Sequence, residues 1–303
     1  MTVSLELKKR QDKFYYLLKN KKFSFTEKLI ASGKIKKPNL AYLQEASKNL
    51  LLSSIIGTDK NKDILTLNFD KILEQIKKKK PNNITHNGLV VPKKETTLEY
   101  NLFLKSFYFF IKNSGISDCI KYFIGPPQLR IKYGLKKQKL QNNSSEYIHS
   151  DAWTQLNTKK SITIFVPIYG DTHRNYVEFY SPKDKFLEEW LNPKFFSDAS
   201  IDLLKSYKKT KLKYSIGDFI LADCSTLHQS VILSNAKPRV SIDIGIIPKN
   251  ITKFKKLQNH IEKVNIENIG FNSLFLFNKS IKDKIILSKD GRKTMSNRKI
   301  YKY

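Results

Sequence analysis

Two histidines and one aspartate have the residue types and spacing of a metal-ligand set. His149 and Asp151 are separated by one residue, and His228 follows much later in the chain. Imidazole and carboxylate ligands suit Fe(II), and three ligands on one face of an octahedron leave three positions open. Residues i and i+2 of a strand point to the same side, so we expect His149 and Asp151 to project together and His228 to arrive from another strand. That these three residues fall in this order by chance remains an alternative for the motif taken alone.

Arg239 is a candidate anion-binding residue. It begins a stretch, residues 239–246, whose alternation places Arg239, Ser241 and Asp243 on one face of a strand. An arginine aimed inward requires an anionic partner, because an unpaired buried charge is costly. A planar guanidinium holds a carboxylate through two hydrogen bonds, and Ser241 adds a hydroxyl donor. The alternative is that Arg239 simply pairs with Asp243 or another acid at the sheet surface.

The combined pattern resembles that of the Fe(II)/2-oxoglutarate-dependent oxygenase superfamily. Its members carry His-x-Asp, then a distant His, then an Arg or Lys about one strand later; His149, Asp151, His228 and Arg239 match these positions. Ser241 matches the Arg-x-Ser form of part of the superfamily. Roughly residues 125–250 are covered. Within the superfamily, residues 149–153 (HSDAW) are similar to a bacterial group related to phytanoyl-CoA dioxygenases and often associated with surface-carbohydrate biosynthesis.

The resemblance implies a mainly β fold, the double-stranded β-helix or cupin-like jelly roll, with the metal near one mouth of the barrel. It implies Fe(II) bound by the triad and 2-oxoglutarate held at its distal carboxylate by Arg239. Trp153 and Gln155 continue the side that carries His149 and Asp151, so we expect them to contact 2-oxoglutarate or substrate, although Trp153 could instead cap the core. The implied activity is oxygenation by O₂, most simply hydroxylation, of a carbohydrate or sugar-containing intermediate. 2-Oxoglutarate would be converted to succinate and CO₂.

The surrounding sequence predicts three regions. Residues 1–124 are expected to be mostly helical and to pack on the barrel, with helices over residues 65–80 and 100–112. Residues 125–250 are expected to form the barrel, interrupted at about 180–211 by an insertion with helical patterning. Such insertions commonly select the substrate in this superfamily. Residues 251–303 are expected to form a basic helical extension.

The composition is strongly basic, with 56 Lys and Arg against 27 Asp and Glu in 303 residues and a formal charge of +29. Because Lys is accompanied by abundant Asn and Ile, we attribute most of the excess to compositional bias. The functional alternative is attraction to anionic or phosphorylated small molecules, lipid head groups or nucleic acid. A nucleic-acid dioxygenase is disfavoured, since no nucleic-acid module is recognisable. A non-oxidative cupin-type sugar isomerase or binding protein stays open.

The remaining candidates carry less weight. Cys119 and Cys224 are too few for a disulfide framework or a metal cluster. The sequence has no signal-peptide core and no apolar run long enough for a membrane span, so we expect a cytoplasmic protein. His173 and Arg174 fall in a turn and either reach a substrate group or face solvent, and His86 is expected to be structural.

Overall fold

The computed structural model describes residues 3–19, 23–56, 67–91, 96–135, 140–153 and 159–249, together with four short segments at 261–263, 285–287, 293–295 and 300–302. The helices are α1 (Leu5–Leu18), α2 (Lys37–Ile56), α3 (Phe69–Lys79), α4 (Thr97–Ser114) and α5 (Ile201–Lys205). The strands are β1 (Ser24–Glu27), β2 (Ile30–Lys34), β3 (Ile120–Lys132), β4 (Ile162–Gly170), β5 (Asn175–Pro182), β6 (Tyr207–Lys209), β7 (Asp218–Asp223), β8 (Leu227–Ile232) and β9 (Arg239–Pro248), followed by β10 (Ile261–Lys263), β11 (Ile285–Leu287), β12 (Lys293–Met295) and β13 (Ile300–Lys302).

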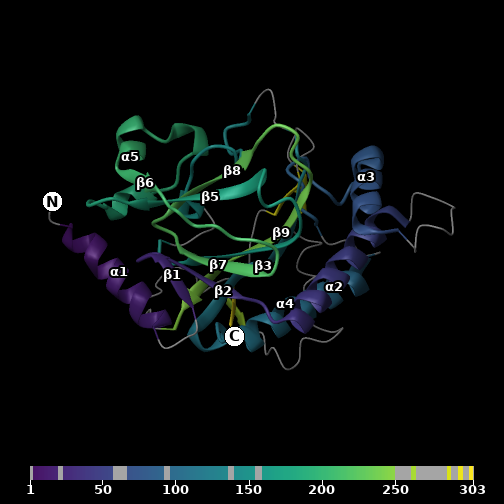
Figure 1. Ribbon diagram of the computed structural model, residues 1–303, viewed down its shortest axis with the longest axis horizontal. Coiled ribbons are helices and arrows are strands. Elements are labelled where there is room, and N and C mark those ends of the chain that lie inside the picture. Colours follow the sequence, from purple (N-terminus) through teal and green to yellow (C-terminus); the bar gives the residue numbers. More distant parts are fainter. Residues whose placement is uncertain are drawn as a thin grey trace.

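The strand order is that of a double-stranded β-helix. One sheet runs β1-β2-β7-β4-β9-β3-β13-β10, and a second runs β6-β5-β8. Figure 1 shows β5, β6 and β8 of the second sheet to one side of β2, β3 and β7 of the first. An antiparallel bridge between His149 and His228 adds a short segment to the free edge of β8. From β3 onward the chain passes repeatedly between the two sheets, with β5 and β6 consecutive in the second, giving the order β7-β4-β9-β3 in one and β6-β5-β8-His149 in the other. This is the arrangement of an eight-stranded jelly roll, and the predicted fold class is confirmed.

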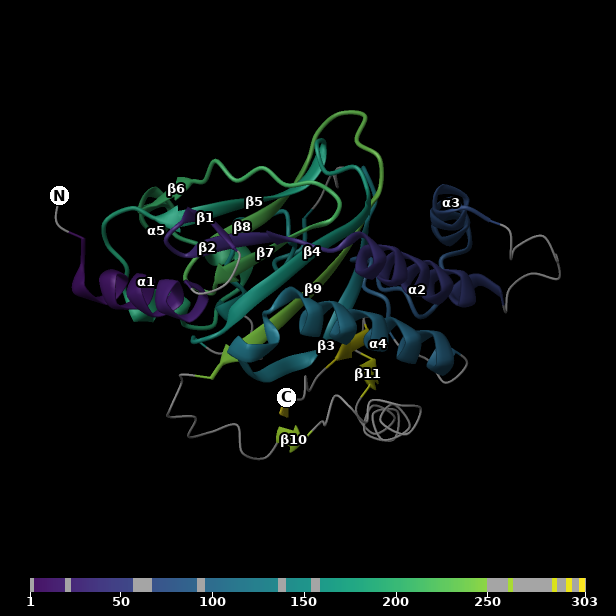
Figure 2. The ribbon, with the colours of Figure 1, turned by 60° about the horizontal axis from the view of Figure 1, so that its bottom comes forward.

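The central strands β4, β7 and β9 of the larger sheet are buried on both faces. The barrel-facing side of this sheet includes Arg239 and Ser241, whereas the alternate residues of β9, Val240 and Ile242, belong to the main hydrophobic core. Two long helices, α2 and α4, lie side by side against this outer face (Figure 2). Burying both faces explains why β4 and β9 are almost continuously apolar apart from the residues that point inward.

The two predicted helices of the N-terminal region are confirmed, with adjusted ends. The expected stripe on α4 is fully buried at Phe103, Phe107 and Phe110. The other helix, α3, starts at Phe69, where the Asn68 side chain accepts a hydrogen bond from the Lys71 amide. It ends at Lys80, whose left-handed backbone (φ 48°) precedes a proline.

The N-terminal region also contains a hairpin that the prediction missed. β1 and β2 pair with each other, and β2 pairs with β7 in the register Ile30↔Ala222 to Lys34↔Asp218. The sequence of this hairpin, SFTEKLIASGK, is too polar and too rich in small residues to give a strand pattern. Its position depends on the edge of β7, which is a tertiary effect.

Two further boundaries need correction. β3 begins at Ile120, before the predicted barrel start at residue 125. Beyond residue 249, the described segments are the short strands β10–β13, and most of the region predicted as a helical extension lies outside the described residues. The insertion is partly helical, as expected: it contains two 3-10 turns and α5, and β6 lies within its predicted range. Among the residues described, no helix is both long and apolar enough to traverse a bilayer.

Candidate metal centre

His149, Asp151 and His228 converge, as the spacing predicts. A ring nitrogen of each histidine and a carboxylate oxygen of Asp151 lie within 4.8 Å of one another. The two histidines lie on directly paired backbone: the His149 amide donates to the His228 carbonyl at 2.9 Å, and the His228 amide donates to the His149 carbonyl at 2.8 Å. Their rings are 4.3 Å apart between centroids. This backbone pairing holds His149 and His228 next to each other at the edge of the smaller sheet.

Asp151 reaches the site by a different local structure from the one predicted. Residues Asp151–Trp153 form a 3-10 turn, so strand alternation does not extend past His149. Ser150 is fully buried and stabilises the turn, because its hydroxyl donates to the Cys224 carbonyl at 2.6 Å and accepts from the Ala152 amide at 3.1 Å. The turn directs the Asp151 carboxylate toward His228, with 3.6 Å between Oδ1 and Nε2.

The surroundings of His149 favour a neutral imidazole. Burial, reinforced by the neighbouring His228, lowers the pKa of His149 to about 3. Its Nδ1 lies 2.8 Å from the Tyr147 carbonyl, which fixes Nδ1 as the protonated nitrogen and leaves Nε2 as a free electron-pair donor. The ring stacks on Phe196 at 3.9 Å between centroids, with an angle of 18° between the planes. Protonation, tautomer and ring orientation are therefore all set for metal binding.

Asp151 also has an outer partner. Its Oδ2 accepts a hydrogen bond of 2.5 Å from the Thr163 hydroxyl on β4. Hydrogen bonds of this type orient a ligating carboxylate and leave its other oxygen for the metal. Two imidazoles and one carboxylate on one side of the site fit a divalent ion such as Fe(II), which keeps its remaining positions open.

Arg239 lies in the barrel interior and is 1% exposed. Its Nη1 donates to the Asn175 carbonyl at 3.1 Å, and the guanidinium carbon lies 5.4 Å from the centre of the Phe165 ring. Its Nε is buried and has no hydrogen-bond partner. Burial lowers the pKa of Arg239, but an arginine remains charged at neutral pH. A buried cation with an unused donor fits an anionic ligand.

The predicted alternative partner of Arg239 is engaged elsewhere. Asp243 forms its ion pair with Arg130 on β3, at 3.3 Å, and Arg130 also donates to Gln128 at 2.7 Å. Ser241 is buried on the same face of β9, directly opposite Arg130 in the sheet. Arg239 is opposite Lys132, whose ammonium donates to the Ser145 hydroxyl at 2.5 Å. Three cations thus line the barrel side of β3 and β9.

The other predicted site residues are dispersed. Trp153 is buried, its indole N–H donates to the Trp190 carbonyl at 2.7 Å, and it packs on Phe196, so it lies behind the metal ligands. Gln155 lies outside the described residues. His173 and Arg174 are exposed in the turn that leads into β5.

Three contributors to the site were missed by sequence reasoning. Thr163 alternates with apolar residues on β4, and this alternation could have predicted that its hydroxyl points into the barrel. Asn175 donates to the carbonyls of Lys132 and Lys237 as well as accepting from Arg239. Phe196 comes from the insertion, and no local pattern marks it.

The strand order and the convergent ligands define the class: a double-stranded β-helix protein with a site made of two histidines and one carboxylate. No protein-family model matches the sequence, and no curated protein matches it. Solved structures with a similar fold were found. One is AviO1 from Streptomyces viridochromogenes Tue57, 12% identical, with a TM-score of 0.40 over 83% of this chain and 99% of that chain.

Two further similar structures are of proteins described with a metal or a cosubstrate. EctD from S. alaskensis, solved with bound Fe, is 16% identical, with a TM-score of 0.42 over 72% of each chain. The "non-heme alpha ketoglutarate dependent epimerase SnoN from nogalamycin biosynthesis" is 11% identical, with a TM-score of 0.35 over 82% of this chain and 91% of that chain. The fold of the present chain follows from its own strand order.

Proposed function

We propose that this protein is an Fe(II)/2-oxoglutarate-dependent oxygenase acting on a small molecule. The observation that carries the proposal is the presence, in one barrel, of the converged His149, Asp151 and His228 and of a buried Arg239 whose Nε has no partner. The triad alone would fit any divalent metal site on this fold. An isomerase or a binding protein would not require the buried arginine.

Each residue has a defined task. His149, His228 and Asp151 would hold the ferrous ion, and Thr163 would keep Asp151 in position. When bound, Fe(II), 2-oxoglutarate and O₂ together supply the oxidation of a C–H bond, with succinate and CO₂ as the other products. Arg239 would bind the distal carboxylate of 2-oxoglutarate.

The barrel around these residues supports the proposed task. Asn175 orients the guanidinium of Arg239 through its main-chain carbonyl. The buried rings of Phe165 and Phe179 line the same interior and exclude water.

The proposed substrate is a carbohydrate or sugar-containing intermediate that carries an anionic group. The resemblance of residues 149–153 to the group associated with surface-carbohydrate biosynthesis supports the sugar. The cations Arg130 and Lys132 in the barrel support the anionic group. Cys119 and Cys224 are free thiols, and a reducing cytoplasm, which preserves both thiols and ferrous iron, is the compartment we propose.

The test is an anaerobic titration of the Fe(II)-loaded protein with 2-oxoglutarate, followed by the visible charge-transfer absorption of the chelate. We expect a saturable band that is absent in His149→Ala. Iron that binds without producing the band would overturn the proposal and indicate a non-oxidative cupin.

The role of Arg239 has a separate readout in the same titration. Arg239→Met should raise the 2-oxoglutarate dissociation constant roughly 100-fold, because a charge-assisted pair of hydrogen bonds is lost. Arg174→Met, which removes an exposed arginine, is the matched control and should leave the constant unchanged. An unchanged constant in Arg239→Met would remove the cosubstrate role from this residue.

A further inference from the structure

The N-terminal helix contains one buried arginine, Arg10, whose partners lie near the segments that carry the metal ligands. Arg10 lies in the middle of α1, and its side chain is only 10% exposed. Its Nε donates to Asp223 Oδ1 at 2.5 Å, and its Nη1 donates to Glu188 at 2.9 Å. Its Nη2 donates to the Lys159 carbonyl at 2.5 Å and to the Cys224 sulfur at 2.9 Å. Every nitrogen of the guanidinium is therefore engaged.

These partners belong to three separate chain segments. Asp223 and Cys224 form the turn between β7 and β8, Glu188 lies in the first 3-10 turn of the insertion, and Lys159 follows the segment that carries Asp151. Burial raises the pKa of Cys224 to about 12, so its sulfur is a neutral acceptor rather than a competing charge. A planar guanidinium with five donors can join several acceptors in fixed directions, which a lysine cannot do.

The β7–β8 turn contacts the segment that carries two of the metal ligands. Asp223 Oδ1 also accepts from the Ser225 amide at 2.8 Å and the Ser225 hydroxyl at 2.6 Å, which closes the turn. The Cys224 carbonyl accepts from Ser150, the residue between His149 and Asp151. His228 lies four residues beyond Cys224, at the start of β8. Arg10 thus holds Asp223, which closes the turn, and the Cys224 carbonyl of that turn accepts from the residue between His149 and Asp151.

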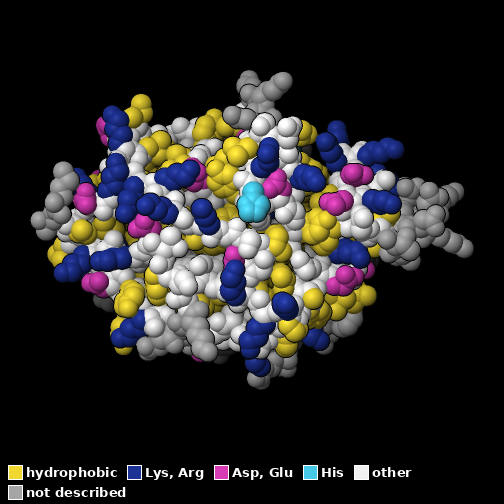
Figure 3. Space-filling model, in the orientation of Figure 1, with side chains coloured by type: hydrophobic (Ala, Val, Ile, Leu, Met, Phe, Trp, Pro, Cys, Tyr) yellow, Lys and Arg dark blue, Asp and Glu magenta, His cyan; other side chains and the backbone are white. Residues whose placement is uncertain are grey.

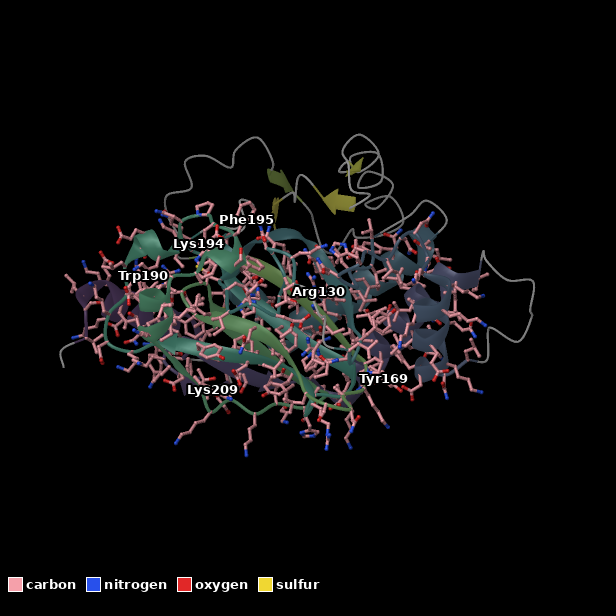
Figure 4. All side chains as sticks on the ribbon, turned by 90° about the horizontal axis from the view of Figure 1, so that it is seen from above. Arg130, Tyr169, Trp190, Lys194, Phe195 and Lys209 are labelled. Atoms are coloured by element: carbon pink, nitrogen blue, oxygen red, sulfur yellow. The ribbon has the colours of Figure 1, made fainter. Side chains whose placement is uncertain are left out.

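The insertion is connected to the same helix and the same ligands. The Ser4 amide donates to the Asp184 carbonyl at 2.8 Å, and the Arg10 guanidinium lies 5.4 Å from the centre of the Phe186 ring. Further along, Phe196 stacks on His149. Figure 4 shows Trp190, Lys194 and Phe195 of the insertion close to one another, with Arg130 nearer the middle of the molecule.

We propose that Arg10 is a positioning residue for the metal centre, acting through Asp223 and Cys224 on the segment that carries His149 and Asp151. It does not touch the metal or the substrate. Its function is to hold the β7–β8 turn, the insertion and Lys159 in one arrangement, so that the ligand set is preorganised before metal binds. The inference rests on the proposed function only in taking the three ligands as a metal site.

The test measures Co(II) binding by the full chain, using the visible absorption of the bound ion. Arg10→Gln should weaken Co(II) binding by about tenfold or more, as the loss of an outer partner does at metal sites, and should change the shape of the absorption band. Asp223→Asn, which keeps the shape of the side chain but weakens its pairing with Arg10, should act in the same direction. Arg10→Lys retains the charge without the planar donor set and should recover only part of the affinity.

Two controls separate positioning from general stabilisation. Leu7→Ala removes a fully buried side chain from the same helix and should lower the thermal midpoint without changing Co(II) affinity. Lys9→Gln removes an exposed positive charge from α1 and should change neither quantity. If Arg10→Gln binds Co(II) as tightly as the unmodified chain, or if Leu7→Ala weakens binding equally, the proposal is overturned.

A second readout is independent of metal binding. In the metal-free protein, Arg10→Gln should increase amide hydrogen exchange in residues 146–153 and 223–230, relative to Leu7→Ala. Should the unmodified chain bind no Co(II), the metal-site assignment would fail, and exchange alone would decide the role of Arg10. Equal exchange in the two variants would then overturn it.

Discussion

At the scale of single residues, each metal ligand has a partner that orients it. The Tyr147 carbonyl fixes the His149 ring, backbone pairing fixes His228, and the Thr163 hydroxyl fixes Asp151. The partner of Asp151 is the one that a substitution can remove without altering the backbone. It therefore gives the sharpest test of how the ligands are oriented.

Thr163→Val keeps the shape of the side chain and removes only the hydroxyl. We expect metal affinity to fall roughly tenfold, because the Asp151 carboxylate loses its orienting donor. Thr163→Ser retains the hydroxyl and should preserve the affinity. Isothermal titration of both variants with Co(II) makes the comparison, and equal affinities in the two would show that the Thr163 hydroxyl is dispensable.

The ligand residues were predictable from the sequence, whereas most of their partners were not. His149, Asp151, His228 and Arg239 form a one-dimensional pattern that is recognisable from residue type and order, although Asp151 lies in a 3-10 turn rather than on the expected strand. Thr163 and Asn175 become partners only when separate strands are brought into register. The contact of Phe196 with His149 depends on the path of the insertion, which no local periodicity determines.

At the scale of elements, the apolar alternating strands were predictable and the β1–β2 hairpin was not. The packing of β2 against β7 is tight at Gly33. A side chain added there would place its first carbon 2.3 Å from Cζ of Phe219. Phe219 is itself enclosed, with edge-on contacts to Phe23 and Phe110. The hairpin therefore fits the sheet because residue 33 has no side chain.

Gly33→Ala should lower the free energy of unfolding by about 1–3 kcal/mol, because the Phe219 ring or the β2 backbone must shift. Ser32→Ala, one residue earlier on the same strand, should change it by less than about 0.5 kcal/mol. Urea denaturation measures both. The cost of Gly33→Ala should shrink in a Phe219→Leu background, and an undiminished cost would show that the ring is not the obstacle.

At the scale of the whole molecule, the dominant property is charge. Figure 3 shows Lys and Arg side chains distributed across one face among acidic and hydrophobic ones, not gathered into one patch. Charge of one sign spread over a surface repels itself in the compact state. This arrangement agrees with the attribution of most of the +29 charge to compositional bias.

Raising the salt concentration should therefore stabilise the protein. The Debye length falls from about 30 Å at 0.01 M to about 8 Å at 0.15 M, which screens repulsion between surface lysines. We expect the thermal midpoint to rise by a few degrees over this range at pH 7 and to change little above it. A midpoint that falls with salt would mean that ion pairs such as Lys34–Asp218 outweigh the general repulsion.

The position of β9 has a consequence for how the chain folds during synthesis. β9 is the last strand of the barrel to be made, yet it lies in the middle of its sheet, between β3 and β4. Until β9 emerges from the ribosome, β3 and β4 are not connected through a common strand. The edge that each will pair with β9 is exposed and prone to aggregation. The barrel must therefore close late and through distant contacts, which predicts slow folding and a need for chaperones while the chain is nascent.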